Sequence, residues 1–139
     1  MVRRWVWMLL ILAVVRVGAQ SDDGYAEALR RIEAARTSGE ALIDLTHLGL
    51  TEVPPEIGTL TQVVVLLLSG NELTTLPPEI AEMTALRHLD LRANQLTRLP
   101  TTIADLPQLE KLDLRWNHKL QSVPGWISEL EARGCLVYC

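Results

Sequence analysis

The sequence predicts a single α/β domain in which four copies of one short unit stack on one another. Apolar residues recur every 23 positions between residues 40 and 130. The 139-residue chain contains 26 leucines and no phenylalanine, and only 4% of its residues are aromatic. A core of Leu, Ile and Val alone is expected when each copy fills the same interior positions again. The hydrophobic fraction of 48% excludes a disordered chain.

Seven columns of like residues carry the 23-residue period. One copy reads LRHLDLRANQLTRLPTTIADLPQ and covers residues 86–108. So many columns, held over three or four copies, exclude a chance pattern. The columns are Ile43, Leu66, Leu89, Leu112; Leu45, Leu68, Leu91, Leu114; Asn71, Asn94, Asn117; Leu50, Leu73, Leu96, with Leu120 one place late; Val53, Leu76, Leu99, Val123, each followed by Pro; Ile57, Ile80, Ile103, Ile127; and Leu60, Met83, Leu106, Leu130.

This pattern resembles the leucine-rich repeat family over residues 40–130. The LPxxI segment and the 23-residue length resemble the Ras-group type, which also occurs beside the GTPase module of Roco-type proteins. The entry segment RRIEAARTSGEALIDLTHLGL, residues 30–50, is similar to the start of such arrays. The resemblance implies a curved solenoid, a parallel sheet on its concave face, and protein binding as the usual function. The sequence contains no GxxxxGK[ST] P-loop.

Residues 1–19 have the layout of a secretory signal peptide. Residues 1–4 (MVRR) are a short basic start, and residues 5–15 form an uncharged apolar run. Small residues follow, which predicts cleavage after Ala19. The run is shorter than the roughly 20 residues of a membrane span, and an uncleaved signal-anchor stays open as an alternative. Cleavage would leave 10 Lys+Arg against 17 Asp+Glu, a net charge of −7.

Residues 20–39 are predicted to form an N-terminal helical cap. Apolar side chains recur at i, i+3, i+4 and i+7 over residues 22–37, which is typical of an amphipathic helix. Asp22 or Asp23 can cap the start of this helix, and Gly39 can end it. We expect the helix to cover the open side of the first repeat.

Each of the four repeats in residues 40–130 is predicted to contain a short strand, as in LDL at 89–91. Leu89 and Leu91 would point to one side of this strand, and His88, Asp90 and Arg92 to the other. Parallel pairing of the copies would stack the leucines from repeat to repeat. One repeat cannot offset its own chain entropy, so stacking is what makes the fold possible.

The asparagine column follows the strands, where the chain turns. A short amide there can hydrogen-bond backbone groups of the turn that would otherwise be buried and unpaired. The column comprises Asn71, Asn94 and Asn117. The first repeat has Leu48 in this column, so its turn is expected to lack the amide bonds. The fourth repeat has one extra residue, in Asn117-His118-Lys119, and is expected to bulge there.

Residues 131–139 are predicted to form a C-terminal strand cap, preceded by a short helix near residues 128–133. Leu136 and Tyr138 lie 24 positions after two inward leucines of the fourth repeat. These two side chains are therefore expected to point inward. The side chains expected to point outward are Cys135, Val137 and Cys139. On an extended strand the Cα atoms of the two cysteines would be about 13 Å apart, which is too far for a disulfide.

The strand pattern and the resemblance together predict a binding surface on the concave sheet face. An apolar patch is expected at Val65 and Leu67, and a charged patch on the next two strands, flanked by Trp116. Interface hot spots favour Trp, Tyr and Arg. The alternative is a solvated strand face with Asp–Arg pairs. The charged patch comprises His88, Asp90, Arg92, Lys111, Asp113 and Arg115.

Catalysis, a metal site and a cofactor are not predicted. Asp90 and Asp113 would lie about 4.8 Å apart on neighbouring strands, but the arginines beside them favour neutralising ion pairs over acid–base work. His88 and Asp90 have no third metal ligand at a suitable spacing. No Ser–His–Asp or Cys–His arrangement is recognisable. The net charge of −4 and pI of 5.3 argue against nucleic acid as the main partner.

The sequence therefore predicts a non-catalytic module that binds a protein or peptide across its concave face. The signal peptide predicts a secreted or periplasmic location. Two other functions stay open, namely a fragment of a larger signalling protein with a GTPase or kinase part, and a glycan- or envelope-binding module. A membrane-anchored or cytoplasmic location also stays open, with membrane contact only if the N-terminal segment is uncleaved.

Overall fold

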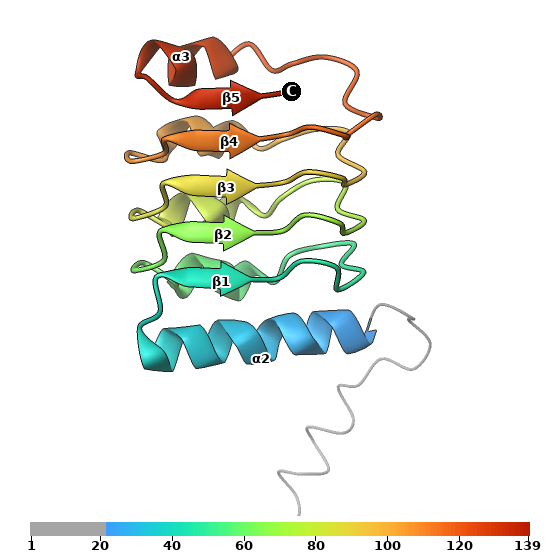
Figure 1. The fold of residues 1–139 in the computed structure, drawn as a ribbon, viewed down its shortest axis with the longest axis vertical. Helices are drawn as coiled ribbons and strands as arrows, with labels where there is room; N and C mark the ends of the chain where they lie inside the picture. The colour runs from blue at the N-terminus through green and yellow to red at the C-terminus, as the bar shows by residue number, and fades with distance from the viewer. Residues whose placement is uncertain (1–21) are drawn as a thin grey trace, which may run out of the picture.

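The computed structural model describes residues 22–139, so the predicted signal peptide lies outside the described residues. Helix α2 (Asp22–Ser38) is followed by five strands that form one parallel sheet in chain order. Figure 1 shows the strands one above another, with α2 at one end of the stack and α3 at the other. The predicted α/β solenoid is confirmed. The strands are β1 (Leu42–Asp44), β2 (Val65–Leu67), β3 (His88–Asp90), β4 (Lys111–Asp113) and β5 (Leu136–Tyr138).

The strand register follows the 23-residue period through the first four strands. Leu66 pairs with Leu89, and Leu89 with Leu112, so each leucine lies directly above its copy. All three side chains are fully buried. Because the side chains of a strand alternate between its two faces, this register sends the flanking residues of every strand to the opposite face of the sheet.

Short helices cover the side of the sheet to which these leucines point. The LPxxI segments form 3-10 helices that begin at or just after their prolines, where φ of Pro77 is −69° and φ of Pro100 is −65°. Each helix buries one isoleucine of the column completely. The helices are η1 (Pro55–Thr59), η2 (Pro78–Glu82), η3 (Thr101–Asp105) and the α-helix α3 (Ile127–Ala132).

The buried asparagines connect each coil to the coil before it. The Oδ1 atom of Asn71 accepts hydrogen bonds from the backbone N–H groups of Leu48 and Leu50, both at 3.0 Å. Its Nδ2 atom donates to the carbonyl oxygens of Leu45 and Leu68, at 2.9 and 2.8 Å. Asn94 and Asn117 make the same two donations in the following coils, and each accepts one backbone N–H, from Leu73 and Leu96 respectively. Each amide therefore satisfies backbone groups of two coils at once.

The expectation that the first turn lacks amide bonds is wrong. Leu48 occupies the asparagine column in the first repeat, but the amide that serves this turn belongs to Asn71 of the second repeat. The asparagine of one coil completes the turn of the preceding coil. The first repeat needs no asparagine of its own because only α2 precedes it.

The two ends of the solenoid are covered by helices. Ala28, Ile32 and Ala35 of α2 are buried against the first coil, and Gly39 ends α2 with φ of 73° and an N–H bond to the carbonyl of Ala35. At the other end, α3 buries Ile127 and Leu130. The extra residue of the fourth repeat is taken up by an additional turn at 118–119, where the Leu120 N–H bonds the Asn117 carbonyl.

The predicted orientation of the last strand is wrong. Lys111 pairs with Leu136, and Leu112 with Val137, so the step from β4 to β5 is 25 residues. A shift of one residue reverses both faces of a strand. Leu136 and Tyr138 are therefore exposed, while Cys135 is buried.

Val123 also departs from its column, because it is 52% exposed where Val53 and Leu76 are 3% exposed. In residues 22–139, β5 pairs with β4, but no further loop of this kind follows the one that holds Val123.

The asparagine ladder makes a prediction about stability. Asn94→Ala should lower the free energy of unfolding by about 2 kcal/mol, because it leaves the Leu73 N–H buried without a partner and removes one of the two amide donors to each of the Leu68 and Leu91 carbonyls. Asn94→Asp should cost at least as much at neutral pH, since a carboxylate cannot donate to the carbonyls, and should recover in part at low pH. Urea unfolding measures the stability of both variants.

Gln95→Glu, at the exposed neighbour of Asn94, is the control and should change stability by less than about 0.5 kcal/mol. Equal stability of Asn94→Asp and the unchanged protein would contradict the ladder.

Candidate functional site

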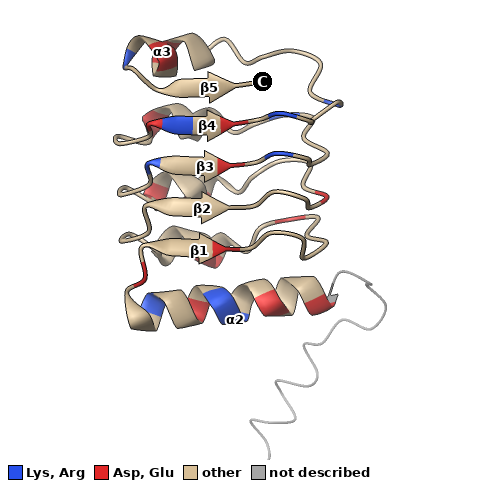
Figure 2. Ribbon diagram, in the orientation of Figure 1, with Lys and Arg blue, Asp and Glu red and all other residues tan. Residues whose placement is uncertain are grey.

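The sheet face that points away from the 3-10 helices is the candidate site, and we call it the open sheet face. Figure 2 shows that most of its charged residues gather on β3 and β4 and the turns that follow them, that β1 ends on one acidic residue, Asp44, and that β2 and β5 carry none. Three zones follow one another along the stack. The apolar zone is Leu42, Val65 and Leu67, with the exposed Asp44 beside Leu67; the charged zone is His88, Asp90, Arg92, Lys111, Asp113 and Arg115; and the aromatic zone is Trp116, Leu136 and Tyr138.

Two aspartates and two arginines form the centre of the charged zone. Asp90 accepts hydrogen bonds from Nε and Nη2 of Arg92 at 2.8 and 2.7 Å, and from the Arg92 backbone N–H at 3.1 Å. Asp113 and Arg115 repeat the same three bonds. Because Asp90 and Asp113 are register partners, Arg92 Nε also lies 3.8 Å from Asp113 Oδ2. The predicted neutralising pairs are confirmed.

The carboxylates of these pairs are buried, and the guanidinium groups are not. Asp90 is 3% exposed and Asp113 is 1% exposed. The side chains of Arg92 and Arg115 are 37% and 42% exposed. Burial acts to raise the pKa of both aspartates, but the hydrogen bonds from the arginine side chains and backbone outweigh it, so each pKa lies below its ordinary value. The open sheet face therefore presents the positive ends of the pairs to a partner.

Cations and aromatic rings meet where the charged zone joins the aromatic zone. The Arg115 guanidinium lies 5.5 Å from the ring centroid of Trp116 and 5.4 Å from that of Tyr138. Lys111 Nζ approaches the Tyr138 ring at 5.3 Å. Such contacts hold both the rings and the cations in place. Trp116 is 57% exposed and Tyr138 is 39% exposed, so these rings stay accessible.

Trp116 has an unfavourable backbone conformation. Its φ is 62°, and the equivalent residues of the other coils, His47, Gly70 and Ala93, also have positive φ. The turn therefore requires this conformation in every coil, and glycine adopts it at least cost. A bulky residue there costs about 1–3 kcal/mol. Since Gly70 occupies the same place, Trp116 is not needed for the turn.

His88 lies half-buried at the start of β3. Burial lowers the pKa of this imidazole below its ordinary value, and the neighbouring charge of Lys111 lowers it further, against the opposing effect of Asp90 and Asp113. The ring is therefore neutral at physiological pH, when it can both donate and accept a hydrogen bond.

Models of the leucine-rich repeat match residues 41–96 and 61–118, and a second leucine-rich repeat model matches residues 108–130. The chain belongs to the leucine-rich repeat family. Domains of this family are generally non-catalytic and typically bind proteins.

The Leptospira structure agrees with the family assignment. A leucine-rich repeat protein of Leptospira interrogans is 30% identical, with a TM-score of 0.66, and the alignment covers 78% of this chain and 27% of that one. This leucine-rich repeat chain thus spans only about a quarter of the length of its Leptospira relative. The leucine-rich repeat domain of the type III effector XopL is 28% identical, with a TM-score of 0.48 and coverage of 65% and 38%. No curated protein matches the chain.

Sequence reasoning missed Leu136 and Tyr138, because the solenoid ends with a 25-residue step. The extra residue in Asn117-His118-Lys119 accounts for one added position, and the second lies between it and β5. The residues predicted for the site are otherwise all on the open sheet face. The structure brings His88, Asp90, Arg92, Lys111, Asp113 and Arg115 together on two neighbouring strands, with Val65 and Leu67 beside them on β2 and Trp116 after β4.

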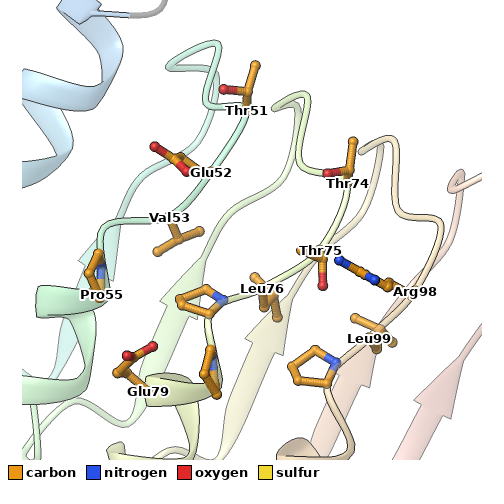
Figure 3. Close-up of a pocket in the computed structure, with 13 residues that line it drawn as sticks. Thr51, Glu52, Val53, Pro55, Thr74, Thr75, Leu76, Glu79, Arg98 and Leu99 are labelled. Carbon is orange, nitrogen blue, oxygen red and sulfur yellow. The ribbon is translucent and has the colours of Figure 1, made fainter.

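A groove that sequence reasoning also missed lies among the loops that lead into the 3-10 helices of the repeats. Figure 3 shows an open groove whose walls come from the equivalent loops of three successive coils. Its volume is about 620 Å³, and its walls are mainly Thr, Pro, Val and Leu, with Glu52, Glu79 and Arg98 as the charged groups. The lining of this groove contains no aromatic side chain, unlike the open sheet face.

Three other properties of residues 22–139 bear on function, namely metal ligation, membrane spanning and thiol reactivity. No group of three His, Cys, Asp or Glu residues in this range could hold a metal ion. None of the helices described has the length and hydrophobicity to span a bilayer. Cys135 and Cys139 are free thiols, and burial raises the pKa of both. A raised pKa lowers the thiolate fraction and hence the reactivity.

The aspartate–arginine pairs predict a pH dependence of stability. A carboxylate whose pKa is lowered in the folded state stabilises the fold above its unfolded pKa of about 4, and this contribution is lost as the pH falls through the folded value. Asp90→Asn/Asp113→Asn should therefore weaken the loss of stability between about pH 5 and pH 2, and should also lower stability at pH 7. Urea unfolding across this range measures the slope. Asp105→Asn, at an exposed carboxylate of η3, is the control. A double variant as acid-sensitive as the unchanged protein would contradict the role of the pairs.

Proposed function

We propose that this leucine-rich repeat protein binds a protein or peptide on its open sheet face. The observation that carries the proposal is the row of arginines held by buried aspartates between two groups of exposed apolar side chains. Leu42, Leu136 and Trp116 are 47%, 59% and 57% exposed, and grouping of exposed apolar side chains is typical of interaction sites.

The geometry also lowers the cost of binding. A free arginine side chain loses rotamer entropy when it is fixed at an interface, on the order of 1 kcal/mol. Arg92 and Arg115 are already fixed by two side-chain bonds each. Trp116 and Tyr138 are fixed by contacts with Arg115. Trp, Tyr and Arg are the residues that most often dominate binding energy.

We also propose that the repeats belong to the 23-residue LPxxI type, which resembles the Ras-group arrays. Three of the outer segments form 3-10 helices that bury the isoleucine of this motif. Outer segments of five residues each match this short type of repeat.

Variants that copy other coils can test the binding face without harming the fold. Val65→Lys introduces the residue found at Lys111, and Trp116→Gly introduces the residue found at Gly70. We expect this double variant to keep its stability within about 1 kcal/mol. It should recover at least about tenfold less of each protein that the unchanged full chain captures from the source cells.

The control for this capture experiment carries the same charge change away from the sheet. Gln108→Lys alters an exposed residue in the turn between η3 and β4. This variant should recover the same proteins as the unchanged chain. Equal recovery by the Val65→Lys/Trp116→Gly variant would move the binding surface off the open sheet face. Charge reversal at Arg92 and Arg115 is a poorer test, because it leaves two buried carboxylates unpaired.

We also propose that the protein is exported, on the basis of the basic start, apolar run and small residues of positions 1–19. N-terminal sequencing of the protein from the secreted or periplasmic fraction should then begin at Gln20. A chain that keeps Met1 and stays in the cytosol would contradict export, and an intact chain in the membrane fraction would indicate an anchor.

A further inference from the structure

The part of the open sheet face on β3 and β4 is opposite in charge to the molecule as a whole, because it carries Arg92, Lys111 and Arg115 against Asp90 and Asp113. Residues 22–139 contain 10 Lys+Arg and 17 Asp+Glu, a net charge of −7. On β3 and β4, however, both carboxylates are buried, while Arg92, Lys111 and Arg115 reach the surface. An acidic protein therefore presents a local cationic strip, and the potential of such a strip attracts a negatively charged partner.

The arginines still have donors to offer. A guanidinium group carries five N–H donors. In Arg92 and Arg115 the aspartates accept from Nε and Nη2, and within residues 22–139 no acceptor lies within bonding distance of Nη1. One edge of each guanidinium is thus occupied and the other edge is open. Because the two arginines belong to adjacent coils, about 4.8 Å apart, their open edges can bind one carboxylate together or two in succession.

The three zones also set the length of a partner. The five strands extend over four spacings of about 4.8 Å, which is roughly 19 Å from β1 to β5. An extended peptide that crosses the strands covers this distance with roughly six residues at about 3.3 Å each. Its ends would lie on the apolar zone and the aromatic zone, and its middle on the cationic strip.

We propose that the open sheet face binds a short extended peptide segment with acidic residues at its centre and apolar or aromatic residues on both sides. The cationic strip receives the carboxylates, and Leu42, Val65 and Leu67 receive the apolar side chains at one end. Trp116, Leu136 and Tyr138 receive those at the other end. This inference rests on the proposed function and adds the chemistry of the partner to it.

The test uses synthetic hexapeptides with blocked ends, so that only side chains carry charge. The probe Leu-Tyr-Glu-Glu-Tyr-Leu reads the same in both directions, so it matches the face whichever way it lies. The comparison peptides are Leu-Tyr-Lys-Lys-Tyr-Leu and Ser-Ser-Glu-Glu-Ser-Ser. NMR titration of the full chain follows the Nε–H signals of Arg92 and Arg115 and the indole N–H of Trp116. We expect the first peptide to shift these signals and to bind at least about tenfold more tightly than either comparison peptide.

The two lysines of the chain provide a matched pair of variants. Lys111 lies on the cationic strip, and Lys119 lies in the exposed turn at the end of the stack. Lys111→Glu should weaken binding of the Glu peptide by about fivefold or more, whereas Lys119→Glu should change it by less than about twofold. Both variants carry the same change in charge, so a general electrostatic effect would weaken binding equally in both.

Three outcomes would overturn the inference. These are tighter binding of the Lys peptide, no shift of the three reporter signals with the Glu peptide at millimolar concentration, and equal effects of Lys111→Glu and Lys119→Glu. The result is separable from the proposed function. If the capture experiment locates a protein on the open sheet face while the Glu peptide fails, the face binds a partner of other chemistry.

Discussion

The structure depends on one constraint, namely that each coil must bury a turn whose backbone groups it cannot pair by itself. The three asparagines meet this requirement, because each amide bonds the turn of its own coil and that of the coil before it. The leucine column supplies most of the buried apolar area, but apolar contacts alone tolerate slippage. The amides allow only one alignment of neighbouring coils.

That alignment also builds the open sheet face. Once successive strands are in register, residues at the same place in each coil become neighbours across the sheet. Asp90 and Asp113 lie side by side for this reason, and Arg92 and Arg115 with them. A change in one column changes one strip of the surface and leaves the core intact. The different zones of the face therefore sit on a uniform interior.

The periodic part of the molecule could be predicted from the sequence, and the ends could not. Seven columns predicted the sheet, the inward leucines and the charged patch, because the geometry of one coil determines the next. β5 follows a 25-residue step, and nothing in the spacing of Leu136 or Tyr138 indicated the added residue. The burial of Asp90 and Asp113 was also missed, since a repeat pattern shows which face a residue is on but not how arginines cover it.

The most direct test of the stacking account is hydrogen exchange of the asparagine side chains. The chain contains three asparagines, Asn71, Asn94 and Asn117, and the structure buries and bonds all of them. Their Nδ2 protons should exchange at least about a hundredfold more slowly than the side-chain amide protons of Gln95 and Gln108, which are exposed. Asparagine protons that exchange as fast as those of the glutamines would show that the amides do not hold the coils together.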